Sequence, residues 1–162
     1  MTPGSTSPDS TSPDRRSSGA RALPTVTDTE AFGSEIAAEL RAGDLVILDG
    51  PLGAGKTALA RGIGAGLGVV GRVSSPTFII AREHRPGDSG RPGMVHVDAY
   101  RLGGLDELDA LDLDTDLEDT VVVVEWGEGV AERLADHHLL VRLRRDPDTD
   151  VRQVKWEWVT SE

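Results

Sequence analysis

Eight consecutive residues have the types and spacing of a phosphate-binding loop. They read Gly50-Pro51-Leu52-Gly53-Ala54-Gly55-Lys56-Thr57 and satisfy the pattern G-x-x-x-x-G-K-[ST]. Glycines let the backbone approach phosphates closely, and the loop amides form a concave anion site with the positive end of the following helix. Lys56 should reach the β- and γ-phosphates of ATP, and Thr57 should bind magnesium, which favours oxygen ligands. The loop therefore predicts a site for ATP and Mg2+.

Two acidic residues follow apolar runs further along the chain. Asp98 comes after residues 94–97, and Glu125 comes after the four valines at 121–124. Ligands of open α/β sheets lie beyond the carboxyl ends of the strands, so both acids could project toward the nucleotide. A P-loop enzyme needs one carboxylate for magnesium and another to position the attacking water. The sequence leaves open which of the two does which.

The elements on either side of the loop are those that such a motif requires. Residues 45–48 form a continuous apolar run, which predicts a strand buried on both faces of a parallel sheet. A helix is expected from Lys56 onward, because Leu59, Ile63 and Leu67 recur every four residues. Its glycines each weaken a helix by about 1 kcal/mol relative to alanine; they are Gly62, Gly64 and Gly66.

The remaining pattern predicts an α/β protein. Thr27 and Glu30 have the spacing of a capping box, and an apolar stripe should continue to a terminator at Gly43; the stripe is Phe32, Ile36 and Leu40. Further strands are expected at 78–82, 94–98, 121–125, 139–144 and 151–159, the last two joined by a turn. Val154, Trp156 and Trp158 share one face of the final strand, which indicates core packing. The expected fold is a three-layer P-loop NTPase-like fold with a mostly parallel central sheet and a C-terminal antiparallel hairpin.

Composition limits the classes of protein that the chain can belong to. Its 162 residues suit one domain, and residues 1–23 have the polar composition of a disordered tail before an ATPase domain at 24–162. A net charge of -11 argues against direct, tight binding of nucleic acid. No apolar stretch is long enough to cross a bilayer, and the N-terminus does not resemble a signal peptide, so a cytoplasmic protein is expected. Cysteine is absent, which excludes thiolate chemistry.

Several other polar residues have no clear assignment. The four histidines, His84, His96, His137 and His138, do not form a zinc pattern and receive no role. Eight acids between 106 and 119 have no ligand spacing, so a solvated face is expected there. Residues 74–77 could form a switch that senses the γ-phosphate, or a simple turn.

Four motifs in order resemble one family, the bacterial TsaE (YjeE) proteins of tRNA threonylcarbamoyladenosine biosynthesis. They are the loop at 50–57, Ser75-Pro76-Thr77-Phe78, Asp98-Ala99-Tyr100-Arg101-Leu102 and Val124-Glu125-Trp126. The resemblance covers residues from about 25 to 160. It implies a role in the threonylcarbamoyl modification of adenosine 37 in tRNA, in which ATP hydrolysis resets a complex of TsaD, the transferase, with TsaB. The tRNA would be contacted mainly through these partners.

The resemblance also implies roles for individual residues. Lys56 and Thr57 would bind phosphate and magnesium, Glu125 would be a magnesium ligand, and Asp98 would order magnesium or the water. Trp126 would lie beside the nucleotide. Two residues differ from the common family pattern: Pro51 stands where many members have Asp, and Ala58 where a second Thr is common. We expect slower turnover or altered affinity from these two differences, rather than loss of function.

Three alternatives share the loop. A small-molecule kinase would need an acceptor site, and its candidate phosphate clamps are Arg82, Arg85, Arg91 and Arg101. A regulatory GTPase is disfavoured because neither Lys56 nor Lys155 fits a guanine-selecting N-K-x-D motif. A non-catalytic module, in which ATP only organises a surface for partners, has the same sequence signature as a slow ATPase.

Overall fold

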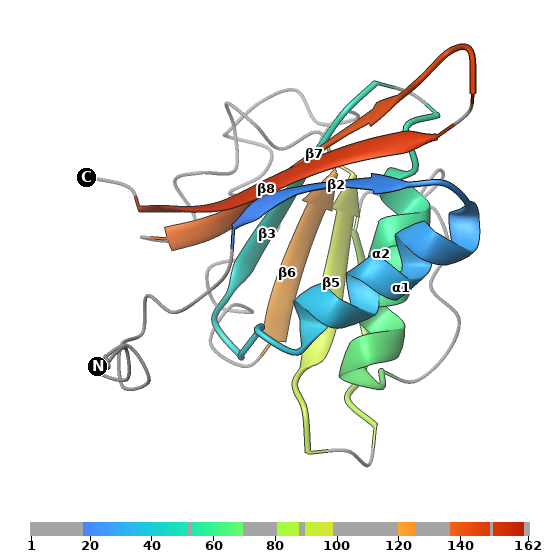
Figure 1. Cartoon of the computed structure of the whole chain (residues 1–162). Coiled ribbons are helices and arrows are strands. Elements are labelled where there is room, and N and C mark those ends of the chain that lie inside the picture. The colour runs from blue at the N-terminus through green and yellow to red at the C-terminus, as the bar shows by residue number, and fades with distance from the viewer. Residues whose placement is uncertain are drawn as a thin grey trace, which may run out of the picture.

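A computed structural model describes residues 18–51, 53–69, 81–87, 90–98, 120–125, 137–149 and 151–160 of the chain. The elements in these ranges are β2 (Gly19–Leu23), α1 (Val26–Ala37), β3 (Leu45–Asp49), α2 (Lys56–Leu67), β4 (Ala81–His84), β5 (Gly93–Asp98), β6 (Thr120–Glu125), β7 (His137–Arg145) and β8 (Arg152–Thr160). Figure 1 shows α1 and α2 side by side against one face of a single sheet. No helix in the described ranges is long and apolar enough to span a membrane. Residues 1–17, most of the predicted tail, lie outside these ranges.

The sheet has a parallel centre and antiparallel flanks. Its order is β2-β8-β7-β3-β6-β5-β4, and the strands from β7 to β5 are parallel. The pairs β2–β8, β7–β8 and β4–β5 are antiparallel. The expected α/β class is confirmed, but the sheet is mixed rather than mostly parallel. The connections after β4 and β7 are too short for the crossover that a parallel neighbour requires. The expected P-loop NTPase-like, three-layer arrangement stays a prediction.

The predicted positions of the strands agree closely with the structure at the centre of the sheet. The strands expected at 94–98 and 121–125 correspond to β5 and β6. The strand expected at 139–144 lies within β7, and the one expected at 151–159 corresponds to β8 to within one residue at each end. The strand expected at 78–82 overlaps β4, which covers Ala81–His84, and residues 78–80 lie outside the described ranges. The apolar run of β3 is completely buried, as expected.

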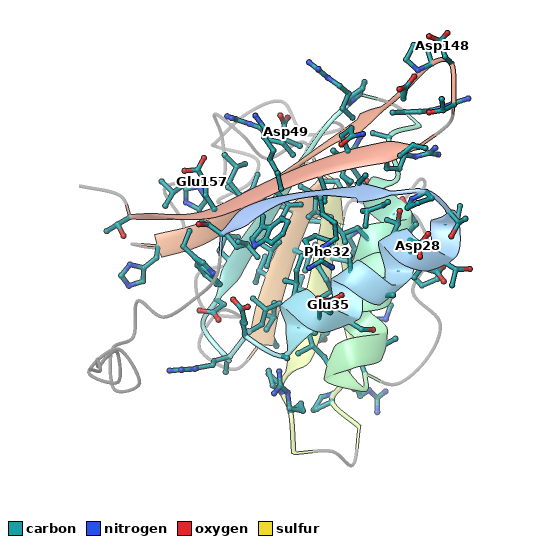
Figure 2. All side chains as sticks on the ribbon, in the orientation of Figure 1. Asp28, Phe32, Glu35, Asp49, Asp148 and Glu157 are labelled. Atoms are coloured by element: carbon teal, nitrogen blue, oxygen red, sulfur yellow. The ribbon has the colours of Figure 1, made fainter. Side chains whose placement is uncertain are left out.

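The edge strand β2 occupies the end of the predicted disordered tail, so that prediction is wrong for Gly19–Leu23. Its residues pair with β8, and Arg21 donates a hydrogen bond to the Glu35 carboxylate at 2.8 Å. The Arg21 guanidinium also lies 5.0 Å from the centroid of the Phe32 ring and 5.6 Å from that of Trp156. Figure 2 shows Phe32 lying between α1 and this edge of the sheet. Contacts distant in sequence therefore hold this segment, which directly follows the polar stretch of the tail.

Helix α1 begins two residues before the predicted capping box. Thr25 is the N-cap: its hydroxyl accepts a hydrogen bond from the Asp28 amide at 3.1 Å, and Asp28 Oδ2 accepts one from the Thr25 amide at 3.0 Å. The capping box predicted at Thr27 and Glu30 is therefore wrong. Thr25 and Asp28 have the same separation of three residues, so spacing alone could not distinguish the two pairs. The first pair is used since the chain leaves β2 in the extended conformation that an N-cap needs.

The far end of α1 also differs from its prediction. Phe32 and Ile36 are buried as expected, but the helix ends at Ala37. Leu40 still reaches the core from beyond the helix end. Gly43 does not terminate the helix; it adopts a φ of 98° in the turn that leads into β3.

Helices α1 and α2 contact each other backbone to backbone. The stripe of Leu59, Ile63 and Leu67 is buried, which confirms α2. A Cβ added to Gly62 would lie 2.8 Å from the carbonyl carbon of Glu30 in α1 and closer still to its oxygen. The glycine that weakens α2 as an isolated helix is therefore needed for this approach.

Substitution of Gly62 by alanine is expected to destabilise the fold by about 2 kcal/mol or more, because the obstructing atoms are backbone and cannot rotate away. Urea unfolding followed by circular dichroism measures the change in the free energy of unfolding. Ala65→Ser, at an exposed position of the same helix, is the control and should cost less than about 1 kcal/mol. Equal stability of the two variants would contradict the close packing of α1 and α2.

The tryptophans of β8 contribute to packing, as expected. Val154 is buried, and Trp156 and Trp158 are partly buried against the same core cluster. The ring of Trp156 lies 4.7 Å from that of Phe32, centroid to centroid. These contacts confirm the packing interpretation of the two tryptophans.

Candidate functional site

The predicted phosphate loop connects the end of β3 to the start of α2. Gly55 is the N-cap of α2 and has a φ of 106°, a conformation that glycine adopts without strain. Since Gly55 has no side chain, the first amides of α2 are not capped by the N-cap residue, and the positive end of the helix faces the loop. Leu52 lies outside the described residues. The loop thus has the helix start that anion binding needs.

The ammonium group of Lys56 is buried inside the loop. The side chain is only 5% exposed, and its Nζ donates hydrogen bonds to the carbonyl oxygens of Gly50, at 2.6 Å, and Pro51, at 3.0 Å. A buried ammonium needs such partners, because transfer of an unpaired charge from water costs many kcal/mol. The ammonium is therefore fixed where an anion held by the loop would meet it.

Thr57 is in contact with one of the two predicted acids. Its Oγ1 lies 3.3 Å from Oε2 of Glu125, which ends β6 and is 6% exposed. The same carboxylate oxygen lies 2.5 Å from Nε2 of His96, a fully buried residue of β5. A hydroxyl, a carboxylate and an imidazole thus come from three different elements to one point beside the loop.

The other predicted acid lies at the adjacent strand end. Asp98 is the last residue of β5 and pairs in register with Glu125. Both predicted acids are therefore at the carboxyl edge of the parallel strands, as expected. The described residues contain no group of three or more His, Asp or Glu side chains arranged as a metal site. A magnesium ion bound with ATP needs no such cage, because phosphates and waters supply most of its ligands.

Other predicted residues fall elsewhere. Trp126, the segment 74–77, the acidic stretch at 106–119 and Arg101 lie outside the described residues. Arg91 donates hydrogen bonds to the carbonyl oxygens of Ala37 and Leu40 at the end of α1. Arg85 and Arg91 precede β5, at the end of the sheet opposite to Asp98. These two arginines therefore cannot clamp phosphates at the loop, as the kinase alternative would require.

Residues 23–154 match a family model described as Threonylcarbamoyl adenosine biosynthesis protein TsaE. The chain belongs to the TsaE family. A TsaE relative from Mycobacterium tuberculosis is 57% identical over 146 residues, which cover 86% of this chain and 87% of the relative. Another from Streptomyces coelicolor is 58% identical over 127 residues, covering 76% and 85%. Both are named as tRNA threonylcarbamoyladenosine biosynthesis proteins, so the resemblance that the motifs indicate is confirmed.

A solved structure has a similar fold. The crystal structure of YdiB from Bacillus subtilis matches with a TM-score of 0.67 and 28% identity, over 90% of this TsaE-family chain and 87% of that one. The likeness extends over nearly all of both chains. The described elements therefore belong to a fold that this chain shares with YdiB.

In this TsaE-family chain, His96 is a site residue that the sequence pattern did not single out. It has no zinc spacing, and one histidine in an apolar run is commonly a packing residue. The signal that could have indicated it is its position in β5, two residues before the strand-end residue Asp98. A polar residue in an otherwise apolar strand, next to a strand-end acid, is a candidate for contact with the site.

Two arginines were also missed. Arg145 and Arg152 are paired across β7 and β8, on the face of the buried Leu143 and Val154. Nη1 of Arg145 lies 4.0 Å from the position that a Cβ on Gly53 would take, and Nε of Arg152 lies 3.6 Å from that on Gly55. Their proximity to the loop depends on the extension of β7 beyond β3, which no local pattern encodes.

Proposed function

We propose that this chain binds ATP with magnesium and hydrolyses it in support of tRNA threonylcarbamoyladenosine biosynthesis. The observation that carries the proposal is the convergence of Lys56, Thr57 and Glu125 at the start of α2. A buried ammonium, a hydroxyl and a carboxylate beside an uncapped helix start are the groups that phosphoryl transfer uses. The pathway in this proposal is inferred from the family of the chain, and ATP hydrolysis is inferred from the residues at the loop.

Each residue has a task that follows from its position. The loop amides and the start of α2 hold the phosphates, and Lys56 exchanges the carbonyl oxygens of Gly50 and Pro51 for phosphate oxygens. Thr57 and one of the two strand-end carboxylates, Glu125 or Asp98, would hold magnesium. When bound, the ion draws negative charge from the phosphates. The carboxylate that does not bind the ion orients the attacking water.

Arg145 and Arg152 extend this site toward the hairpin. Their guanidinium groups lie beside Gly53 and Gly55, within reach of the phosphates of a nucleotide held by the loop. Alanine at either position is expected to weaken ATP binding by about tenfold, the effect of losing one charge-assisted hydrogen bond of about 1.5 kcal/mol. Titration of the fluorescent analogue mant-ATP measures this. Arg144→Ala, on the opposite face of β7, is the control and should bind mant-ATP as the wild type does. An equal loss of affinity in the Arg144, Arg145 and Arg152 variants would show that only the net charge of the protein matters.

The partners follow from charge and family. A chain with a net charge of -11 repels the phosphate backbone, so tRNA is contacted through other proteins. We assign these roles to TsaD and TsaB proteins, which would act with the chain in the cytoplasm. The effect of Pro51 and Ala58 on turnover stays a prediction; in the loop, Pro51 contributes its carbonyl oxygen to Lys56.

The content of threonylcarbamoyladenosine in tRNA tests the proposed function. In a bacterium depleted of its own TsaE-family protein, this chain should restore the modified nucleoside, as measured by mass spectrometry of digested tRNA. Lys56→Ala should not restore it at equal protein levels. Full restoration by Lys56→Ala would show that ATP binding at the loop is not needed for the modification. ATP-dependent phosphorylation of a metabolite by the purified chain would favour the kinase alternative.

A further inference from the structure

We infer that His96 is a positioning residue that fixes the Glu125 carboxylate for its work in the nucleotide site. The inference rests on the proposed function, since it assigns His96 a purpose only if Glu125 has one. It starts from the burial of the imidazole. His96 is 0% exposed, and its neighbours in β5, Met94, Val95 and Val97, are buried and apolar.

A polar ring in such a strand requires a compensating contact. Burial of a polar group without a hydrogen bond is costly, and an apolar residue of similar size would fill the same space without that cost. Nε2 of His96 finds its contact at 2.5 Å, on Oε2 of Glu125 in the adjacent strand. Because a carboxylate oxygen only accepts, the hydrogen lies on Nε2. The Nδ1 atom has no hydrogen-bond partner among the described residues, so the ring is directed at Glu125 alone within that part of the chain.

Both known contacts of Glu125 converge on the same oxygen. Thr57 Oγ1 is 3.3 Å from Oε2, longer than a usual O–H···O hydrogen bond, whereas His96 is at the short end of the range. Thr57 is itself a proposed magnesium ligand, so its hydroxyl has a competing task. His96 therefore carries the restraint on Oε2 and leaves Oε1 for a ligand, since no described residue donates to Oε1.

A glutamate side chain has three rotatable bonds, and a functional carboxylate must be held within about 0.5 Å of its working position. Contacts that orient a metal ligand in this way typically change metal affinity or activity by about 10-fold to 100-fold when they are removed. His96 is expected to act within this range. It touches neither ATP nor the reacting atoms, so it acts through Glu125.

The test compares two substitutions in the full chain. His96→Gln places an amide nitrogen near the position of Nε2 and can still donate, whereas His96→Leu has similar bulk and no donor. His96→Leu should lower kcat for ATP hydrolysis by about 10-fold to 100-fold and raise the MgCl2 concentration for half-maximal mant-ATP binding by a similar factor. His96→Gln should recover most of both losses. Affinity for mant-ATP in EDTA should stay within about threefold for both variants, because the phosphates are held by the loop.

A double-mutant cycle with Glu125→Gln separates the inference from the proposed function. If His96 acts through Glu125, His96→Leu should change the MgCl2 dependence by less than about twofold in the Glu125→Gln background. A further tenfold loss there, or equal behaviour of His96→Leu and His96→Gln, would overturn the inference. If Glu125→Gln alone leaves MgCl2 dependence and kcat at wild-type values, the proposed function of Glu125 fails as well. The exposed His137→Leu serves as the matched control.

Discussion

Lys56→Ala should weaken binding of ATP by about 100-fold or more and remove measurable hydrolysis. The ammonium is buried in the loop and donates two hydrogen bonds to carbonyl oxygens that phosphate oxygens would replace. Each charge-assisted hydrogen bond contributes about 1.5–3 kcal/mol, and two of them exceed the 2.7 kcal/mol that corresponds to 100-fold. Isothermal titration with ATP and MgCl2 gives the change in affinity directly.

Lys155→Ala is the matched control for Lys56→Ala, because these are the two lysines of the chain and Lys155 is exposed on β8. It removes the same charge from the protein and should bind ATP as the wild type does. Thermal denaturation without nucleotide should be recorded for both variants, because Lys56 also donates hydrogen bonds to the loop backbone and its loss can lower stability. An affinity of Lys56→Ala within threefold of the wild type would show that the loop does not hold a triphosphate.

Glu125→Gln should lower the rate of ATP hydrolysis by about 100-fold while ATP remains bound. The substitution keeps the size of the side chain and its capacity to accept a hydrogen bond from Thr57 or His96, but it removes the negative charge. A carboxylate that orients a reactant or binds magnesium typically contributes 10²-fold or more to the rate. Single-turnover hydrolysis, measured at saturating ATP, separates this chemical effect from binding.

Glu157→Gln provides the control for Glu125→Gln. Glu157 is an exposed carboxylate on β8, labelled in Figure 2 away from the loop, and its substitution should leave the rate unchanged. If Glu125→Gln hydrolyses ATP normally, the carboxylate is not part of the chemistry. If instead it loses hydrolysis but fully supports tRNA modification, ATP serves to organise the protein, and the non-catalytic module is the correct alternative.

The central strands were predictable because each contains a run of consecutive apolar residues, which indicates a strand buried on both faces. Four apolar residues in β3 and four valines in β6 are enough to specify strands covered on both faces, and the acids that follow them necessarily lie at the carboxyl edge. The loop was predictable for a similar reason, since its glycines and Lys56 are adjacent in sequence. The parallel arrangement predicted that Glu125 lies at the edge of the sheet that carries the loop, whereas its contact with Thr57 is known from the structure.

Features that depend on distant contacts were not predictable. β2 is ordered by Arg21, which reaches Glu35 in α1 and the rings of Phe32 and Trp156. The helix cap shifted to Thr25 because two pairs with identical spacing compete and only the path of the chain decides between them. His96 was missed because its importance lies in a contact across two strands, 29 residues apart in sequence.

Gly62 in α2 is another feature whose role could not be predicted from local sequence. Local propensity counts Gly62 only as a weak point in the helix, at about 1 kcal/mol. In the fold, it is the point at which the backbone of α1 comes into contact. A residue that is unfavourable for its own element can therefore be required by the packing of two elements.

The most direct test of the proposed function is magnesium-dependent hydrolysis of ATP by this chain, measured alone and with TsaD and TsaB proteins of the same bacterium. Hydrolysis should be slow for the chain alone, rise at least tenfold with both partners, as expected where binding completes a catalytic site, and disappear in Lys56→Ala. Hydrolysis that is unaffected by the partners, or that persists in Lys56→Ala, would contradict the account.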